Sequence, residues 1–184
     1  MSVATPLKPS SFVTVMAQVS LVLGIAGTVY ALVQVIAAAV LLRAGELEQG
    51  IASLPLADMP PSAAWLLTHL EGLAWGFLLA SAAFLAVSWG LLRRRPWGWW
   101  GFVAFMVLGA LANFVGIAVV DQVFAWIQAL PANPEVADLQ AELASLRTMS
   151  LAMTTSTALV FAVLHGMIVW KLCTAEIRAE FFPR

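Results

Sequence analysis

Four long apolar stretches, joined by short polar segments, make up almost the whole chain. They cover about 12–42, 63–92, 97–130 and 134–173. A helix needs about 20 predominantly apolar residues to cross a hydrocarbon core of about 30 Å. Each stretch exceeds this length, and the first is far longer than the apolar core of a cleavable signal peptide. The pattern therefore predicts four membrane-spanning helices.

The polar segments between these stretches are too short to fold by themselves. Residues 93–96 are predicted to form a tight turn, and loops at 43–62 and 131–133 connect the other helices. Helices joined by short connections lie antiparallel to one another. The predicted fold class is all-α: a single domain over 1–184, folded as an integral membrane up-down four-helix bundle.

Composition supports a membrane location, and the distribution of charge predicts an orientation. The sequence is 62% hydrophobic and 10% charged, whereas soluble domains carry about 25% charged residues. If the N-terminus is cytoplasmic, all of the nine lysines and arginines except Arg43 and Arg147 lie on the cytoplasmic side. Because basic residues collect on that side, we predict a bacterial inner-membrane protein with both termini and the turn 93–96 in the cytoplasm.

The most distinctive motif is GLLRRRPWGWWGF at 90–102. Its proline suits the first position of a helix, and its tryptophans fall where aromatic belts meet lipid headgroups. The residues predicted to anchor the inner interface are Arg93, Arg94, Arg95, Trp97, Trp99 and Trp100. The alternative is a specific site for anionic lipid headgroups, for which three arginines fall short of the usual cluster of about 4–8 basic residues. Binding of nucleic acid is excluded, because the rest of the chain offers no basic face.

Apolar sequence also continues beyond the length that a membrane requires. A span of about 30 residues reaches about 45 Å, and DQVFAWIQAL at 121–130 resumes the apolar pattern after two polar residues. After PANP, Asn133 is suited to cap a helix over 134–149, whose apolar residues recur at spacings of three and four. We expect the helices to extend past the outer membrane face as a packed bundle. The alternative is an amphipathic helix over 134–149 that lies on the outer leaflet.

Polar side chains inside the spans need partners, because lipid offers no hydrogen bonds. The predicted intramembrane polar residues are Gln18, Thr28, Asn113, Thr157 and His165. Gln18 and His165 fall at about the same depth by helical rise, so we expect a hydrogen bond between them to join the first and fourth helices. A structural role is the default for all five residues, and a proton or ligand site is the alternative.

The chain shows none of the common catalytic motifs, and neither a cofactor nor a metal ligand is predicted. Its single cysteine, Cys173, excludes an intrachain disulfide. At the outer level, His69 and Glu71 are two positions apart, so on one helix they point about 200° apart and cannot share a site. A membrane enzyme acting near Glu71, Asp121 and His69 is therefore the least favoured hypothesis.

These observations favour a non-enzymatic membrane protein that acts as an accessory, assembly or immunity-type interaction subunit. Apolar helix beyond the bilayer must be covered, so the predicted partners are membrane lipids together with a second protein or another copy of the chain. The alternative is a small carrier, or a protein that binds lipid or another hydrophobic ligand in a cavity lined by Thr28, Asn113, Thr157 and His165. The residues predicted to contact a partner at the outer tip are Leu47, Ile51, Leu54, Trp65, Phe124, Trp126, Ile127, Leu139 and Leu143.

Overall fold

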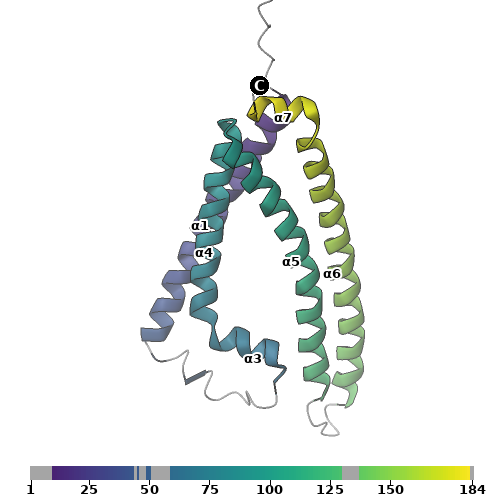
Figure 1. Ribbon diagram of the computed structural model, residues 1–184. Helices are drawn as coiled ribbons and strands as arrows, with labels where there is room; N and C mark the ends of the chain where they lie inside the picture. Colours follow the sequence, from purple (N-terminus) through teal and green to yellow (C-terminus); the bar gives the residue numbers. More distant parts are fainter. Residues whose placement is uncertain (1–9, 44, 46–48, 51–58, 130–136, 183–184) are drawn as a thin grey trace, which may run out of the picture. The chain divides into compact units, whose positions relative to one another are not determined.

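The protein is all-helical throughout the residues that its structure, a computed structural model, describes. These residues are 10–43, 45, 49–50, 59–129 and 137–182, and they include no strand. The all-α fold class predicted from the sequence is thus confirmed for this part of the chain. Its helices (Figure 1) are α1 (Ser11–Arg43), α3 (Pro61–Thr68), α4 (Leu70–Leu92), α5 (Pro96–Ala129), α6 (Ala137–Leu172) and α7 (Ala175–Phe181).

Four of these helices are long and apolar enough to cross a membrane. The candidate spans are Ser11–Leu41, Leu70–Leu92, Pro96–Gln128 and Glu142–Leu172. At most 17% of the most apolar window of any span is buried inside the chain itself. Most apolar side chains of these helices are therefore not covered by the rest of the chain. A helix that crosses a bilayer has the same property, because lipid covers its side chains.

The second apolar stretch forms two helices rather than the one span expected over 63–92. Helix α3 ends at Thr68, His69 departs from helical geometry with φ −116° and ψ 21°, and α4 begins at Leu70. With 23 residues, α4 is about 34 Å long, close to the thickness of the hydrocarbon core.

Competition for one carbonyl group explains the break. The Trp65 carbonyl oxygen accepts the His69 backbone N–H at 3.1 Å, while the Thr68 hydroxyl at 3.1 Å and His69 Nδ1 at 2.9 Å also approach it. Thr68 donates in addition to the Ala64 carbonyl oxygen at 2.9 Å. Side chains that bond backbone groups in this way bend or end helices.

The other helices are longer than α4. Helices α1, α5 and α6 contain 33, 34 and 36 residues, so each is about 50 Å long. The predicted cap at Asn133, the loop 131–133 and most of the loop 43–62 lie outside the described residues.

The chain divides into two compact units, each of which is considered by itself. Every spanning helix contributes residues to both. Unit 1 comprises Met1–Ile36, Ala74–Leu108 and His165–Arg184, and unit 2 comprises Ala37–Leu73 and Gly109–Leu164.

Buried apolar side chains are concentrated in unit 1. Its hydrophobic core consists of Val13, Ala17, Leu91, Trp99, Phe102, Met106, Leu172, Ile177 and Phe181. In unit 2, among the side chains that the structure describes, only Ala158 is both apolar and buried. Because buried apolar area is the main favourable contribution to folding, unit 1 is the better-packed part of the described chain.

Helix α7 closes the core of unit 1. Glu176 in its first turn suits the positive end of the helix dipole. Ile177 and Phe181 are four residues apart, so they share one helix face, and both are buried. The sequence pattern predicts that the fourth helix ends near 173 and predicts no element over Ala175–Phe181.

Candidate functional site

Two backbone hydrogen bonds hold the turn between α4 and α5. Arg95 N–H donates to the Gly90 carbonyl oxygen at 2.9 Å, and Arg94 N–H donates to the Leu91 carbonyl oxygen at 3.1 Å. This pair of bonds is the Schellman motif, which needs a left-handed residue just after the helix. Arg94 takes that position with φ 55°, where glycine is usual.

Close approach of the two helix backbones makes the turn tight. A Cβ on Gly98 would collide with the backbone of Gly90 and Leu91, and one on Gly90 would lie 2.5 Å from the Trp97 ring. Glycine at 98 is therefore required by contact with backbone rather than by φ, whereas a Cβ at 90 would displace the exposed Trp97 ring.

The Arg94 side chain turns inward and ties three segments together. Its Nε donates to Glu180 Oε2 at 2.7 Å, and its Nη2 donates to the Ser10 carbonyl oxygen at 3.1 Å and to Thr14 Oγ1 at 2.9 Å. Glu180 Oε1 accepts the Ser10 N–H at 2.9 Å. The side chains of Arg94 and Glu180 are only 19% and 9% exposed, as expected for charges that are paired and hydrogen-bonded. Arg94, predicted as an interface anchor, is thus a structural clamp.

Trp99 also differs from the expected interface anchor. It belongs to the core of unit 1, and its indole N–H donates to the Leu172 carbonyl oxygen at 3.1 Å. A buried indole needs such an acceptor. Trp99 shares a helical stripe with Phe102 and Met106, at spacings of three and four, and this spacing is the signal that could have placed it in the core.

The remaining anchor residues stay on the surface. Trp97 and Trp100 are exposed. Arg93 places its guanidinium 4.6 Å from the centre of the Trp89 ring, in a cation–π contact. A pocket of about 440 Å³ at this turn is lined by Trp89, Arg93, Arg95 and Trp97 and is called the turn pocket below.

Two of the five intramembrane polar residues are satisfied within their own helix. Thr28 Oγ1 donates to the Gly24 carbonyl oxygen at 2.7 Å. Asn113 Nδ2 donates to the Gly109 carbonyl oxygen at 3.0 Å. A side chain that bonds the carbonyl four residues back needs no neighbouring helix.

The other three intramembrane polar residues remain without an assigned role. Gln18 and Thr157 are exposed, and His165 is half-buried. The hydrogen bond expected between Gln18 and His165 stays a prediction. Thr28 and His165 belong to unit 1, whereas Asn113 and Thr157 belong to unit 2.

Asp121 of α5 forms an ion pair with Arg147 of α6 that the sequence pattern did not predict. Arg147 Nε donates to Asp121 Oδ1 at 2.9 Å, and Arg147 Nη1 donates to Gln128 Oε1 at 3.1 Å. The two charged side chains are 32% and 43% exposed, so their attraction is worth less than that of a buried pair. The sequence does hold a signal for this pair, because Arg147 is the one basic residue near the N-terminal end of the fourth candidate span, Glu142–Leu172.

His69 follows the last residue of α3, and its Nδ1 lies 2.9 Å from the Trp65 carbonyl oxygen. Its ring stacks on Trp65 with 4.7 Å between ring centres. Within the described part of the chain, no group of three or more His, Cys, Asp or Glu side chains is placed to hold a metal ion.

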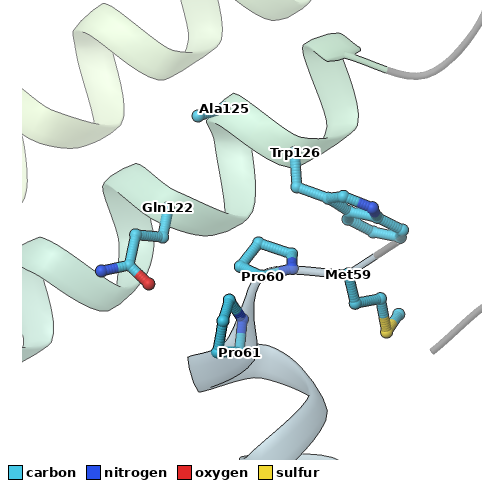
Figure 2. A pocket seen from close by; sticks show the side chains of 6 residues that line it. All are labelled: Met59, Pro60, Pro61, Gln122, Ala125 and Trp126. Atoms are coloured by element: carbon cyan, nitrogen blue, oxygen red, sulfur yellow. The ribbon is translucent and has the colours of Figure 1, made fainter. Parts of the chain in front are cut away.

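A second, apolar pocket lies in unit 2, between the start of α3 and helix α5 (Figure 2). Its volume is about 650 Å³. Ser62 Oγ donates to Gln122 Oε1 and so ties the start of α3 to α5. Trp126 Nε1 is buried and has no hydrogen-bond partner among the described residues. The residues that line this α3–α5 pocket are Met59, Pro60, Pro61, Gln122, Ala125 and Trp126.

Of the residues predicted for the outer tip, only Trp126 lines this pocket. Trp65 is exposed, while Phe124, Ile127 and Leu143 are half-buried. The side chain of Leu139 is outside what the structure describes, as are Leu47, Ile51 and Leu54. The sequence does not predict the contact of Pro60 and Pro61 with α5, because a Pro-rich loop carries no periodic pattern that would indicate which helix it meets.

Comparisons of the chain with models of protein families, with curated proteins and with solved structures find no match.

Proposed function

We propose that this protein is a non-enzymatic subunit of a bacterial inner membrane, with both termini in the cytoplasm, that serves an accessory, assembly or immunity-type role. It binds its partner through the α3–α5 pocket. The observation that carries the proposal is an open apolar pocket lined by Trp126, whose indole N–H is buried and has no acceptor among the described residues.

The position of the pocket along α5 supports a protein partner. A partly exposed ion pair such as Asp121–Arg147 belongs at the membrane surface rather than in hydrocarbon. Ala125 and Trp126 follow Asp121 by at least one helical turn, so on the proposed topology lipid tails do not cover them. Apolar surface outside the lipid is where protein partners bind.

The unpaired indole indicates what the partner supplies. A buried donor without an acceptor costs about 1–3 kcal/mol. Because Trp126 Nε1 has almost no accessible surface, a carbonyl or carboxylate oxygen of a partner segment reaches it only when the indole ring turns toward the pocket. Apolar side chains of the same segment would contact Met59 and the two prolines. Tryptophans in desolvated pockets are frequent centres of binding energy.

The test is gentle extraction from the native membrane followed by native mass spectrometry of the wild type and two variants. Ala125→Arg places a long charged side chain in the pocket. Ala144→Arg makes the same change at an exposed position of α6 that does not line the pocket. We expect a second polypeptide, or a second copy of the chain, with the wild type and with Ala144→Arg, and its loss from Ala125→Arg.

A wild-type protein that emerges without any partner, or an Ala125→Arg variant that keeps it, would contradict the proposal. The thermal unfolding of both variants in detergent serves as the control for folding.

A hydrophobic small molecule or lipid is the second candidate occupant, which would make the protein a carrier. The pocket volume, about 650 Å³, lies within the roughly 300–1,000 Å³ of ligand pockets. The same spectra separate the candidates, because a bound small molecule adds a small, defined mass that Ala125→Arg abolishes.

A further inference from the structure

The three consecutive arginines of the α4–α5 turn are not equivalent. Arg94 is neutralised by Glu180, whereas Arg93 and Arg95 are exposed. Within the described part of the chain, the ion pairs are Arg94–Glu180 and Arg147–Asp121. Arg93 and Arg95 therefore carry positive charge that no described acidic side chain compensates.

These two arginines meet in one pocket and are partly held in place before any ligand binds. The cation–π contact with Trp89 restrains the guanidinium plane of Arg93 and leaves its N–H edges free to donate. The Schellman bonds and the contact between Gly90 and Gly98 fix the backbone from which both arginines project. Such preorganisation lowers the entropy that binding must pay.

The flanking aromatic residues place the turn pocket at a membrane interface. Helices α4 and α5 are both candidate spans, so the turn is where they leave the hydrocarbon. Trp89, Trp97 and Trp100 are exposed around it, and tryptophan is enriched at headgroup level. The anion that a membrane supplies at headgroup level, within reach of the two guanidinium groups, is the phosphate group of a lipid.

We infer that the turn pocket binds the phosphodiester group of an anionic phospholipid. Arg93 and Arg95 donate to its non-bridging oxygens, as guanidinium groups do in bidentate pairs with phosphate. A zwitterionic lipid carries the same phosphate, but its ammonium group is repelled by the two arginines. Inorganic phosphate shares the chemistry but lacks the acyl chains that hold a lipid beside the exposed tryptophans. This inference goes beyond the proposed function and rests on different residues.

The test titrates full-length protein in an uncharged detergent with phosphatidylglycerol, and in parallel with phosphatidylcholine of the same acyl chains. Native mass spectrometry counts the bound lipid. Each basic residue near an anionic lipid surface contributes about fivefold in affinity. We therefore expect the double variant Arg93→Gln/Arg95→Gln to bind phosphatidylglycerol about 25-fold more weakly, with little change for phosphatidylcholine.

A matched control removes the same charge from the same unit. Lys171 and Arg178 are exposed residues of unit 1 that do not line the turn pocket. The double variant Lys171→Gln/Arg178→Gln should keep nearly the wild-type affinity for phosphatidylglycerol. An equal loss in both double variants would show diffuse attraction to charge and would overturn the site.

Two further measurements complete the test. Displacement of phosphatidylglycerol by inorganic phosphate would overturn the lipid assignment and indicate a site for free anions. If the glutamine variant does not fold, Arg93→Lys/Arg95→Lys keeps the charge but loses the planar donor pairs. It should bind phosphatidylglycerol more weakly than the wild type, and unchanged binding would contradict bidentate recognition.

Discussion

At the scale of single residues, Arg94 shows how a strained backbone position is stabilised by a side chain. A residue other than glycine in the left-handed region costs about 1–2 kcal/mol. Arg94 accepts this conformation at φ 55°, and it directs a guanidinium to Glu180, Ser10 and Thr14. A glycine there would fit the turn more easily but would leave the Glu180 carboxylate, 9% exposed, without its cation.

Removing the charge of Glu180 should therefore destabilise the protein. Fully buried pairs lose about 3–5 kcal/mol when one partner is removed. Because Arg94 is 19% exposed, we expect a loss of about 2 kcal/mol for Glu180→Gln. Reversible unfolding in detergent measures it, with the exposed Glu176→Gln in the same helix as the control. If the pair acts as a unit, Arg94→Gln/Glu180→Gln will lose clearly less than the sum of the two single variants.

The contact between glycines makes a second prediction at this scale. In Gly98→Ala the added methyl group meets the backbone of Gly90 and Leu91, which a side-chain rotation cannot relieve. We expect a loss of about 1–3 kcal/mol, as in overpacked cores. The control is Gly166→Ala, where the added Cβ meets no atom within 4 Å. Equal unfolding midpoints for the two variants would show that the helices can separate at the turn without cost.

At the scale of elements, α7 acts as the lid of the core in unit 1. Two adjacent phenylalanines test this role, because Phe181 is 1% exposed and Phe182 is 36% exposed. Phe181→Ala should cost about 3–5 kcal/mol, and Phe182→Ala far less. Thermal unfolding in detergent distinguishes them. Small losses in both variants would mean that α7 is held by the Arg94–Glu180 pair rather than by apolar contact.

The elements also show how far the sequence determines the fold. Apolar length alone predicts the four candidate spans, because a helix that crosses lipid must be apolar over about 20 residues. The break at His69 was not predicted, since Thr68 and His69 interrupt the apolar run without a glycine or proline. Its cause is local hydrogen bonding to the Trp65 carbonyl, which a count of apolar residues does not register.

The candidate sites were predictable only in outline. The motif at 90–102 indicated an interface of arginines and tryptophans, and Arg93, Arg95 and Trp97 do line one pocket. Arg94 and Trp99 turned inward because of contacts with Glu180 and Leu172, residues more than 70 positions away. Spacing within a helix can place Trp99 on a stripe with Phe102 and Met106, but it cannot reveal distant partners such as Glu180, so it does not distinguish Arg94 from Arg93 and Arg95.

At the scale of the whole molecule, buried apolar side chains are distributed unevenly between the two units of the described chain. Nearly all buried apolar side chains belong to unit 1, while Ala158 is the one described in unit 2. A well-packed unit suits a preorganised lipid site such as the turn pocket. A unit with little core of its own gains most from a partner that binds only the folded state. The two proposals thus assign different ligands to the two units, and each ligand suits the packing of its unit.

Both proposals depend on the orientation of the chain, which the single native cysteine can report. Cys173 is exposed in unit 1, and the excess of basic residues near it predicts a cytoplasmic location. A membrane-impermeant maleimide should therefore label the wild type in inverted membrane vesicles but not in intact spheroplasts. In Cys173→Ala/Ser145→Cys, which moves the thiol to an exposed position of unit 2, labelling should occur only in spheroplasts.

Labelling of Cys173 in spheroplasts would reverse the topology. It would then place the arginines of the turn pocket at the outer leaflet, where the positive-inside rule gives no reason for them.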